Sequence, residues 1–177
     1  LHYHDVSEIC NFKDGDVFID FGANLGQEIE YFSKLNLNIH SYEPHPYFFN
    51  KLSSKFSSLE NVTLNNIAVA DKNYTAQFFF KKNPSTWDEN FSCGGASLER
   101  KTNHDPAGSF VEVPCIDVAN ILNKFDSIKI LKMDVEGTEY KILRRMIETN
   151  LLEKPDFIFL EDHQRKIIDL DSFLNLS

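Results

Sequence analysis

Short apolar runs alternate with segments of helical periodicity along most of the chain. The first apolar run is Val17–Ile19. From Gln27 onward, apolar residues recur at three-residue spacing: Ile29, Phe32 and Leu35. A short continuous run predicts a buried parallel strand, and the spacing after it predicts a helix. The ordered part of the chain is therefore expected to begin with a strand, a turn and a helix.

The same alternation continues toward the carboxyl end. Further strands are predicted at 38–42, 62–71, 75–80, 110–114, 128–133 and 155–160. Further helices are predicted from Tyr47, over 117–125, after Thr138 and over 164–176. Strands that alternate with helices are typical of an α/β fold with a parallel sheet.

Two stretches fall outside this alternation. Residues 1–15 carry His2 and His4 at strand-like spacing and end in a turn signal. We interpret them as an exposed leader, with metal binding by the two histidines as the alternative. Residues 81–109 are polar and lack clear periodicity, as a functional segment or a surface excursion would. We expect 81–109 to be an insertion that faces the substrate.

Composition narrows the classes of protein that fit. A chain of 177 residues predicts a single domain, 1–177, with a substantial core. It starts at Leu1 rather than at Met, which leaves open that it is one module of a longer protein. We expect neither a membrane span nor a signal peptide, because no apolar run approaches about 20 residues. The net charge of −9 argues against a nucleic-acid partner.

The cysteines indicate a reducing compartment. Cys10, Cys93 and Cys115 are odd in number and show no C-x-x-C spacing. They fit free thiols better than a disulfide framework or a zinc site. We therefore expect a cytoplasmic protein.

The turn after the first strand has the chemistry of a cofactor site. Gly22 and Gly26 are spaced G-x-x-x-G, so neither the dinucleotide fingerprint nor the phosphate loop is present. Asp20, at the strand tip, would repel a pyrophosphate but attract the ammonium and sulfonium of S-adenosylmethionine (SAM). The alternative is a strand-end carboxylate that only caps the turn.

Two later segments fit an adenosine group. Glu43 lies at the tip of the second strand, 23 residues after Asp20. In doubly wound folds, an acid at about this distance binds the ribose hydroxyls, whether the cofactor is NAD or SAM. Toward the end of the next predicted strand, 62–71, Ile67 and Val69 are expected to flank the adenine, and Asp71 or a backbone group to accept a hydrogen bond from its amine.

Carboxylates also follow the two last strands. Asp134 and Glu136 stand two residues apart after 128–133, and such crowding favours a site that holds a cation or a proton. Thr138 is expected to cap the helix that follows. Glu161 and His163 end the strand 155–160, where a histidine with an ordinary pKa near 6.5 suits a general base.

These motifs together resemble the FkbM family of class I SAM-dependent methyltransferases. The resemblance rests on VFIDFGANLGQ, SYEPHP, NIAVAD, LKMDVEGTEYKIL and KPDFIFLEDH, spread over residues 16–163. It implies a Rossmann-like, doubly wound, mostly parallel sheet of order 3-2-1-4-5. The sequence departs from the superfamily in one respect, because it ends before the usual last two strands, as a truncated chain or a short version of the fold would. The resemblance also implies a cofactor site made by Asp20, Gly22, Asn24, Gly26, Glu43, Ala68 and Asp71.

The resemblance further implies transfer of a methyl group to a hydroxyl of a sugar, a glycan or another natural product. The candidates for the catalytic base are Asp134, Glu136, Glu161 and His163. In a variant of this mechanism, the three carboxylates among them hold a divalent cation that lowers the pKa of the acceptor.

Two other classes remain as alternatives. A nicotinamide-dependent oxidoreductase would use Glu43 in the same way but would need a pyrophosphate turn. A non-catalytic module that binds SAM or a partner protein would carry the same motifs. The expected partner is a small-molecule or glycan acceptor rather than a nucleic acid or a membrane. The sequence predicts neither the acceptor nor the oligomeric state.

Overall fold

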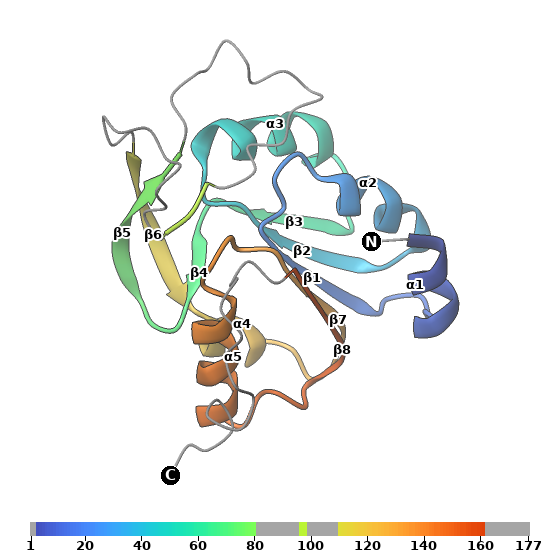
Figure 1. Ribbon diagram of the computed structural model, residues 1–177. Coiled ribbons are helices and arrows are strands. Elements are labelled where there is room, and N and C mark those ends of the chain that lie inside the picture. Colours follow the sequence, from blue (N-terminus) through green and yellow to red (C-terminus); the bar gives the residue numbers. More distant parts are fainter. Residues whose placement is uncertain (1–2, 81–95, 99–109, 162–177) are drawn as a thin grey trace.

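A parallel sheet of five strands, in the order β3-β2-β1-β7-β8, forms the centre of the structure (Figure 1). The structure is a computed structural model that describes residues 3–80, 96–98 and 110–161. The strands of this sheet are β1 (Val17–Phe21), β2 (Asn38–Tyr42), β3 (Val62–Asn65), β7 (Ile128–Met133) and β8 (Pro155–Leu160). All neighbouring pairs are parallel. The predicted order 3-2-1-4-5 and the α/β, Rossmann-like fold class are confirmed, with β7 and β8 as the fourth and fifth strands.

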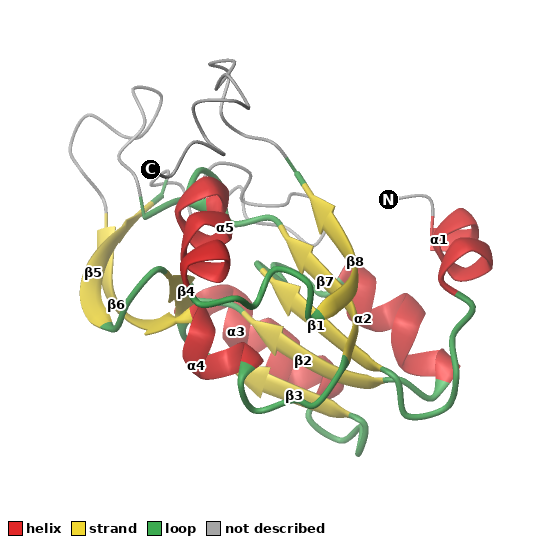
Figure 2. Cartoon of the chain, turned by 90° about the horizontal axis from the view of Figure 1, so that it is seen from below, coloured by secondary structure: helices red, strands yellow, loops and turns green. Residues whose placement is uncertain are grey.

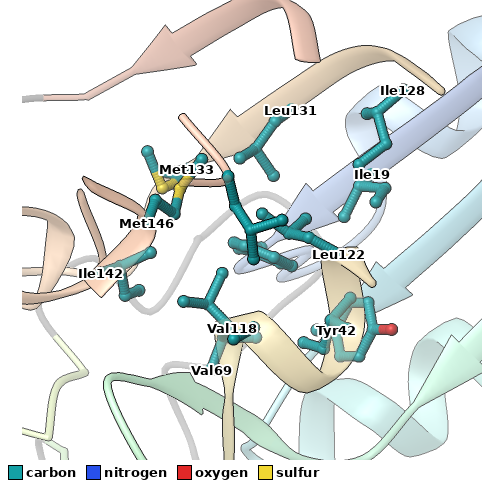
Figure 3. Packing of buried hydrophobic residues seen from close by; sticks show 14 residues of the cluster. Ile19, Tyr42, Val69, Val118, Leu122, Ile128, Leu131, Met133, Ile142 and Met146 are labelled. Carbon is teal, nitrogen blue, oxygen red and sulfur yellow. The ribbon is translucent and has the colours of Figure 1, made fainter. Parts of the chain in front are cut away.

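Helices cover both faces of this sheet. One face carries α1 (Tyr3–Cys10), α2 (Gln27–Phe32), the short 3-10 helix η1 (Ser33–Leu35) and α3 (Pro46–Phe56). The other carries α4 (Val118–Leu122) and α5 (Glu139–Glu148). Because successive strand residues point to opposite faces, Phe18 packs in the first core and Ile19 in the second. Figure 3 shows the second core, where Ile19 and Leu131 of the sheet lie over Leu122 of α4.

A smaller sheet stands beyond the carboxyl ends of the central strands (Figure 2). Its strands are β4 (Ala68–Ala70), β5 (Tyr74–Phe79) and β6 (Phe110–Asp117), in the order β4-β6-β5. β5 and β6 are antiparallel, whereas β4 and β6 are parallel. This sheet forms a wall opposite the strand tips of the central one.

The strand predicted at 62–71 is in fact two strands that belong to different sheets. The chain turns at Asn66, whose side-chain amide donates hydrogen bonds to the carbonyl oxygens of Glu43 (2.8 Å) and Pro44 (3.1 Å). In the sequence, this break coincides with the polar pair Asn65 and Asn66, through which the prediction extended a single strand. Because of the break, Ala68 and its neighbours belong to the wall and not to the central sheet.

The amino-terminal segment differs from the expected exposed leader. It includes α1, whose Val6 and Cys10 are buried in the core beneath Phe18 and Phe32. Val6 and Cys10 are four residues apart and therefore share one helix face.

The segment predicted as a helix over 117–125 also differs. β6 extends to Asp117, whose carboxylate then accepts a hydrogen bond from the Ala119 amide (2.9 Å) and begins α4. The strand continues because Val113 and Cys115 alternate with exposed neighbours and are buried. Of the helices in the described ranges, none has the length and apolar character needed to cross a membrane.

The structure predicts that Gly22, after β1, cannot carry a side chain. Its φ is +85°, and a Cβ there would lie 1.9 Å from the backbone oxygen of Asp134. We expect Gly22→Ala to lower the free energy of unfolding by about 3 kcal/mol or more in urea titrations. Gly15→Ala is the matched control, because Gly15 has a φ of +84° but its nearest neighbour would be 3.9 Å away. For Gly15→Ala, the free energy of unfolding should fall by about 1–2 kcal/mol, from the positive φ alone. Equal losses in both variants would show that the clash with Asp134 has no effect.

Candidate functional site

A pocket lies where the carboxyl ends of the central strands meet the wall formed by the smaller sheet. We call it the main pocket; its empty space, counted together with the open solvent at its mouth, is about 610 Å³. Its polar side consists of residues from the turns after β1, β2 and β7: Gly22, Asn24, Glu43, Asp134, Glu136 and Thr138. Its apolar side consists of Tyr42, Pro44, Phe48, Ile67, Ala68, Val69, Phe78, Ala96, Leu98 and Val135. Concave sites with an apolar lining and a few convergent polar groups commonly bind small molecules.

The main pocket brings together most of the residues predicted to bind a cofactor. Gly22, Asn24, Glu43 and Ala68 line it, whereas Asp20, Gly26 and Asp71 do not. Gly26 instead begins α2, and a Cβ there would overlap the side chains of α3. Asp71 follows β4, near Cys115, whose thiol pKa is raised mainly by burial, and near Arg145, whose pKa is raised mainly by its hydrogen bond with Asp117; the charge of Asp71 adds a minor contribution to both. The predicted contact between Asp71 and an adenine is therefore not supported by its position.

Glu43 joins the turns after β1 and β2. One carboxylate oxygen accepts a hydrogen bond from the Asn24 amide and the other accepts one from the His45 amide, both at 2.8 Å. Burial raises the pKa of Glu43 to about 7, although these two hydrogen bonds oppose the rise. Each carboxylate oxygen has two lone pairs, so Glu43 can still accept hydrogen bonds from a ligand in the main pocket.

Asp20 forms an ion pair that was not predicted from the sequence. It is fully buried, and the ammonium of Lys132 lies 3.1 Å from its Oδ1. Lys132 stands opposite Asp20 in the register of β1 and β7. The expected contact of Asp20 with the positive groups of a cofactor is thus replaced, within the described chain, by an internal ion pair.

Lys132 also contacts the glycine turn and the next strand end. Its Nζ donates a hydrogen bond to the Gly22 carbonyl oxygen (3.0 Å) and lies 3.9 Å from Oδ2 of Asp134. Burial lowers the pKa of Lys132, but the carboxylates of Asp20, Glu28 and Asp134 outweigh this effect and leave it raised. Burial has the opposite effect on a carboxyl group: it raises the pKa of Asp20 to about 6, although the positive charge of Lys132 lowers it. The sequence signal was a lysine inside a buried strand, a residue that is rarely buried without a partner.

The predicted catalytic carboxylates lie in two places. A second hollow, here called the side hollow, is lined by Glu28, Lys132, Met133, Asp134, Phe159, Leu160 and Glu161. Asp134 lines both hollows, whereas Glu136 lines only the main pocket and Glu161 only the side hollow. His163 lies outside the described residues. Asp134 is therefore the predicted acid that stands where the two hollows meet.

The turn after β7 is held by a side chain from another segment. Glu136 has a left-handed φ of 57°, and its carbonyl oxygen accepts a hydrogen bond from the Ser97 hydroxyl (2.6 Å). Ser97 in turn exchanges two backbone hydrogen bonds with Phe79 of β5. The described part of the segment 81–109 thus lies against the main pocket through Ala96 and Leu98.

The cap of α5 differs from the prediction. Thr138 makes no capping hydrogen bond through its side chain. Instead, the carboxylate of Glu139 accepts hydrogen bonds from the amides of Val135 (3.3 Å) and Gly137 (2.9 Å). A glutamate in the first helical turn is the signal that could have found this.

The divalent-cation variant has no support in the described part of the chain. No three of its His, Cys, Asp and Glu side chains are grouped as a metal ion would require. We do not carry this variant further.

The ion pair predicts a specific double-mutant result. We expect Lys132→Met to lower the free energy of unfolding at pH 8 by about 3–5 kcal/mol, because it leaves Asp20 buried without its counter-ion. Adding Asp20→Asn should restore most of the loss. The matched control is Lys129→Met on the same strand, which removes a more exposed pair with Asp156 and should cost less than about 1 kcal/mol. Additive losses in the double variant would contradict the pairing.

Glu43 predicts a dependence of stability on pH. Its folded-state pKa of about 7 lies above the ordinary 4.5, so the folded protein holds a proton that the unfolded chain releases between these values. The contribution of Glu43 to stability therefore falls as pH rises from about 5 to 8. The free energy of unfolding of Glu43→Gln minus that of the wild type should therefore increase between pH 5 and pH 8. The increase should be about 1.4 kcal/mol for each unit by which folding raises the pKa of Glu43. Urea titrations at pH 5 and 8 measure it, with exposed Glu153→Gln as the control, and a constant difference would refute it.

Comparison with known proteins places the chain in a family. The model of the methyltransferase FkbM domain matches residues 20–175. No curated protein gives a significant match. One similar solved structure is the crystal structure of methyltransferase FkbM from Methylobacillus flagellatus KT at 2.20 Å resolution, with 13% identity and a TM-score of 0.49. That match covers 82% of this chain and 32% of the other, so this chain spans about a third of its length. Because the family match extends over well more than half of the sequence, the chain belongs to the methyltransferase FkbM domain family.

Proposed function

We propose that this methyltransferase domain transfers a methyl group from SAM to a hydroxyl of a sugar, a glycan or another natural product. The observation that carries the choice of cofactor is the charge of the main pocket. Its described lining includes the carboxylates of Glu43, Asp134 and Glu136 but no lysine, arginine or histidine. Such a lining favours a ligand with a sulfonium and an ammonium and disfavours a pyrophosphate.

The shape of the main pocket supports the same cofactor. Its apolar side, which includes Phe48, Ile67 and Val69, suits a purine ring. Glu43 lies between this side and the turn that holds Asn24, where its carboxylate can accept hydrogen bonds from the two ribose hydroxyls. These features argue against a nicotinamide-dependent oxidoreductase, because the pyrophosphate of NAD would meet three carboxylates and, among the described lining residues, no cationic side chain.

When bound, SAM supplies a methyl group on a positively charged sulfur, which is already an activated leaving group. The chain then has to hold the acceptor hydroxyl in line and remove its proton, and alignment alone contributes several kcal/mol. We propose Asp134 as the base, because it lines both the main pocket and the side hollow. A positioned base contributes about 10²–10⁴-fold to the rate. Glu136, Glu161 and His163 are the alternative bases predicted from the sequence.

Calorimetric titration of the full-length protein with S-adenosylhomocysteine (SAH) tests the cofactor. We expect micromolar binding by the wild type and none of NAD. Glu43→Ala should weaken binding of SAH by about 10- to 100-fold, since it removes hydrogen bonds to a charged acceptor. Glu153→Gln, on an exposed acid before β8, should bind as the wild type does.

The alternatives predict other results. A folded protein that binds neither SAH nor NAD would support a module that only binds a partner protein. Binding of NAD with a dependence on Glu43 would support the oxidoreductase. Binding of SAH justifies a screen of sugar, glycan and polyketide hydroxyls as methyl acceptors with the full-length protein.

A further inference from the structure

Thr138, between β7 and α5, carries a buried hydroxyl that makes no hydrogen bond within the described part of the chain. The residue is 3% exposed, and its Oγ1 has no hydrogen-bond partner within the described ranges. A buried hydroxyl without a partner costs free energy, and native structures rarely leave one so. Its presence therefore calls for a physical reason.

The usual reason for a threonine at this position does not apply. A threonine before the first residue of a helix ordinarily accepts a hydrogen bond from an amide of the first turn. Here the Thr138 side chain accepts no such bond, and the carboxylate of Glu139 holds the loop before the helix by accepting from the amides of Val135 and Gly137. The helix therefore begins without a hydrogen bond to the Thr138 hydroxyl.

Its position indicates a ligand instead. Thr138 lines the main pocket, together with Glu43 and Asn24, and does not line the side hollow. The Oδ1 of Asn24 is a second buried polar atom of this pocket that has no partner in the described chain. The two atoms come from the turns after β1 and β7, on either side of the place where Gly22 approaches Asp134.

We propose that the Thr138 hydroxyl hydrogen-bonds the cofactor in the main pocket, an inference that rests on the SAM-dependent function proposed above. The occupant is the cofactor rather than the acceptor, because Thr138 shares a pocket with the proposed ribose ligand Glu43. A hydroxyl can donate or accept, and Asn24 Oδ1 accepts only. The two atoms therefore require a ligand that offers at least one N–H or O–H group, as SAM and SAH both do.

The test compares three variants of the full-length protein by SAH calorimetry and by thermal unfolding without ligand. Thr138→Val keeps the shape of the side chain and removes the hydroxyl, whereas Thr138→Ser keeps the hydroxyl. Ser41→Ala is the matched control, because Ser41 also carries a buried hydroxyl without a partner in the described chain but lines neither hollow. The midpoint of unfolding without ligand should be unchanged or higher in Thr138→Val.

The affinity for SAH should fall about 3- to 10-fold in Thr138→Val, as expected for one neutral hydrogen bond. Thr138→Ser and Ser41→Ala should bind as the wild type does. Unchanged affinity in Thr138→Val would overturn the inference while the cofactor assignment stands. A lower midpoint in Thr138→Val would also overturn it, since the hydroxyl would then have a structural partner. No binding by the folded wild type would refute the proposed function itself.

Discussion

The ion pair between Asp20 and Lys132 is the interaction on which the site depends. It joins two adjacent strands, and the same ammonium binds the carbonyl oxygen of Gly22 and approaches Asp134. A buried pair of charges adds little net stability, because desolvation offsets most of the attraction, and apolar residues often do as well. An apolar pair, however, would leave the Gly22 carbonyl without this donor and Asp134 without a nearby cation. The contribution of the pair is therefore to the position of the turns around the main pocket.

The rim of the main pocket is built from backbone in left-handed conformations that other residues hold. Gly22, Asn24 and Glu136 all have positive φ. Lys132 donates a hydrogen bond to the Gly22 carbonyl, and Ser97 donates one to the Glu136 carbonyl. Glu43 accepts one from the Asn24 amide. These three supports come from β7, β2 and the segment at 96–98, which are far apart in sequence. The rim is preorganised because each turn is fixed by a side chain from another element.

Local patterns were enough to predict most strands of the central sheet, whereas their order followed from the resemblance to the FkbM family. The glycine turn, Glu43 and Asp134 were likewise found from local patterns, because strand ends of a parallel sheet meet at one edge and their residues can be placed there from sequence. What failed depended on partners distant in sequence. The pairing of Asp20 with Lys132 follows from the register of two strands over 100 residues apart. The break after Asn65 depends on hydrogen bonds from Asn66 to the residues after β2. The helix α1 could not be predicted from its own sequence, because it is stabilised by the burial of Val6 and Cys10 against other elements.

The electrostatics of the main pocket link ligand binding to protonation. Burial, with a smaller contribution from the charge of Asp20, raises the pKa of Glu43 to about 7, which leaves it only partly ionised near neutral pH. A ligand that brings hydroxyl donors or positive charge favours the carboxylate and lowers this pKa. Binding would then release a proton, and the affinity would rise with pH through the range in which the free protein titrates. An anionic ligand would have the opposite effect, because it would have to bind the protonated form. The buried carboxylate of Glu43 therefore favours a ligand with hydroxyl donors or positive charge over an anionic one.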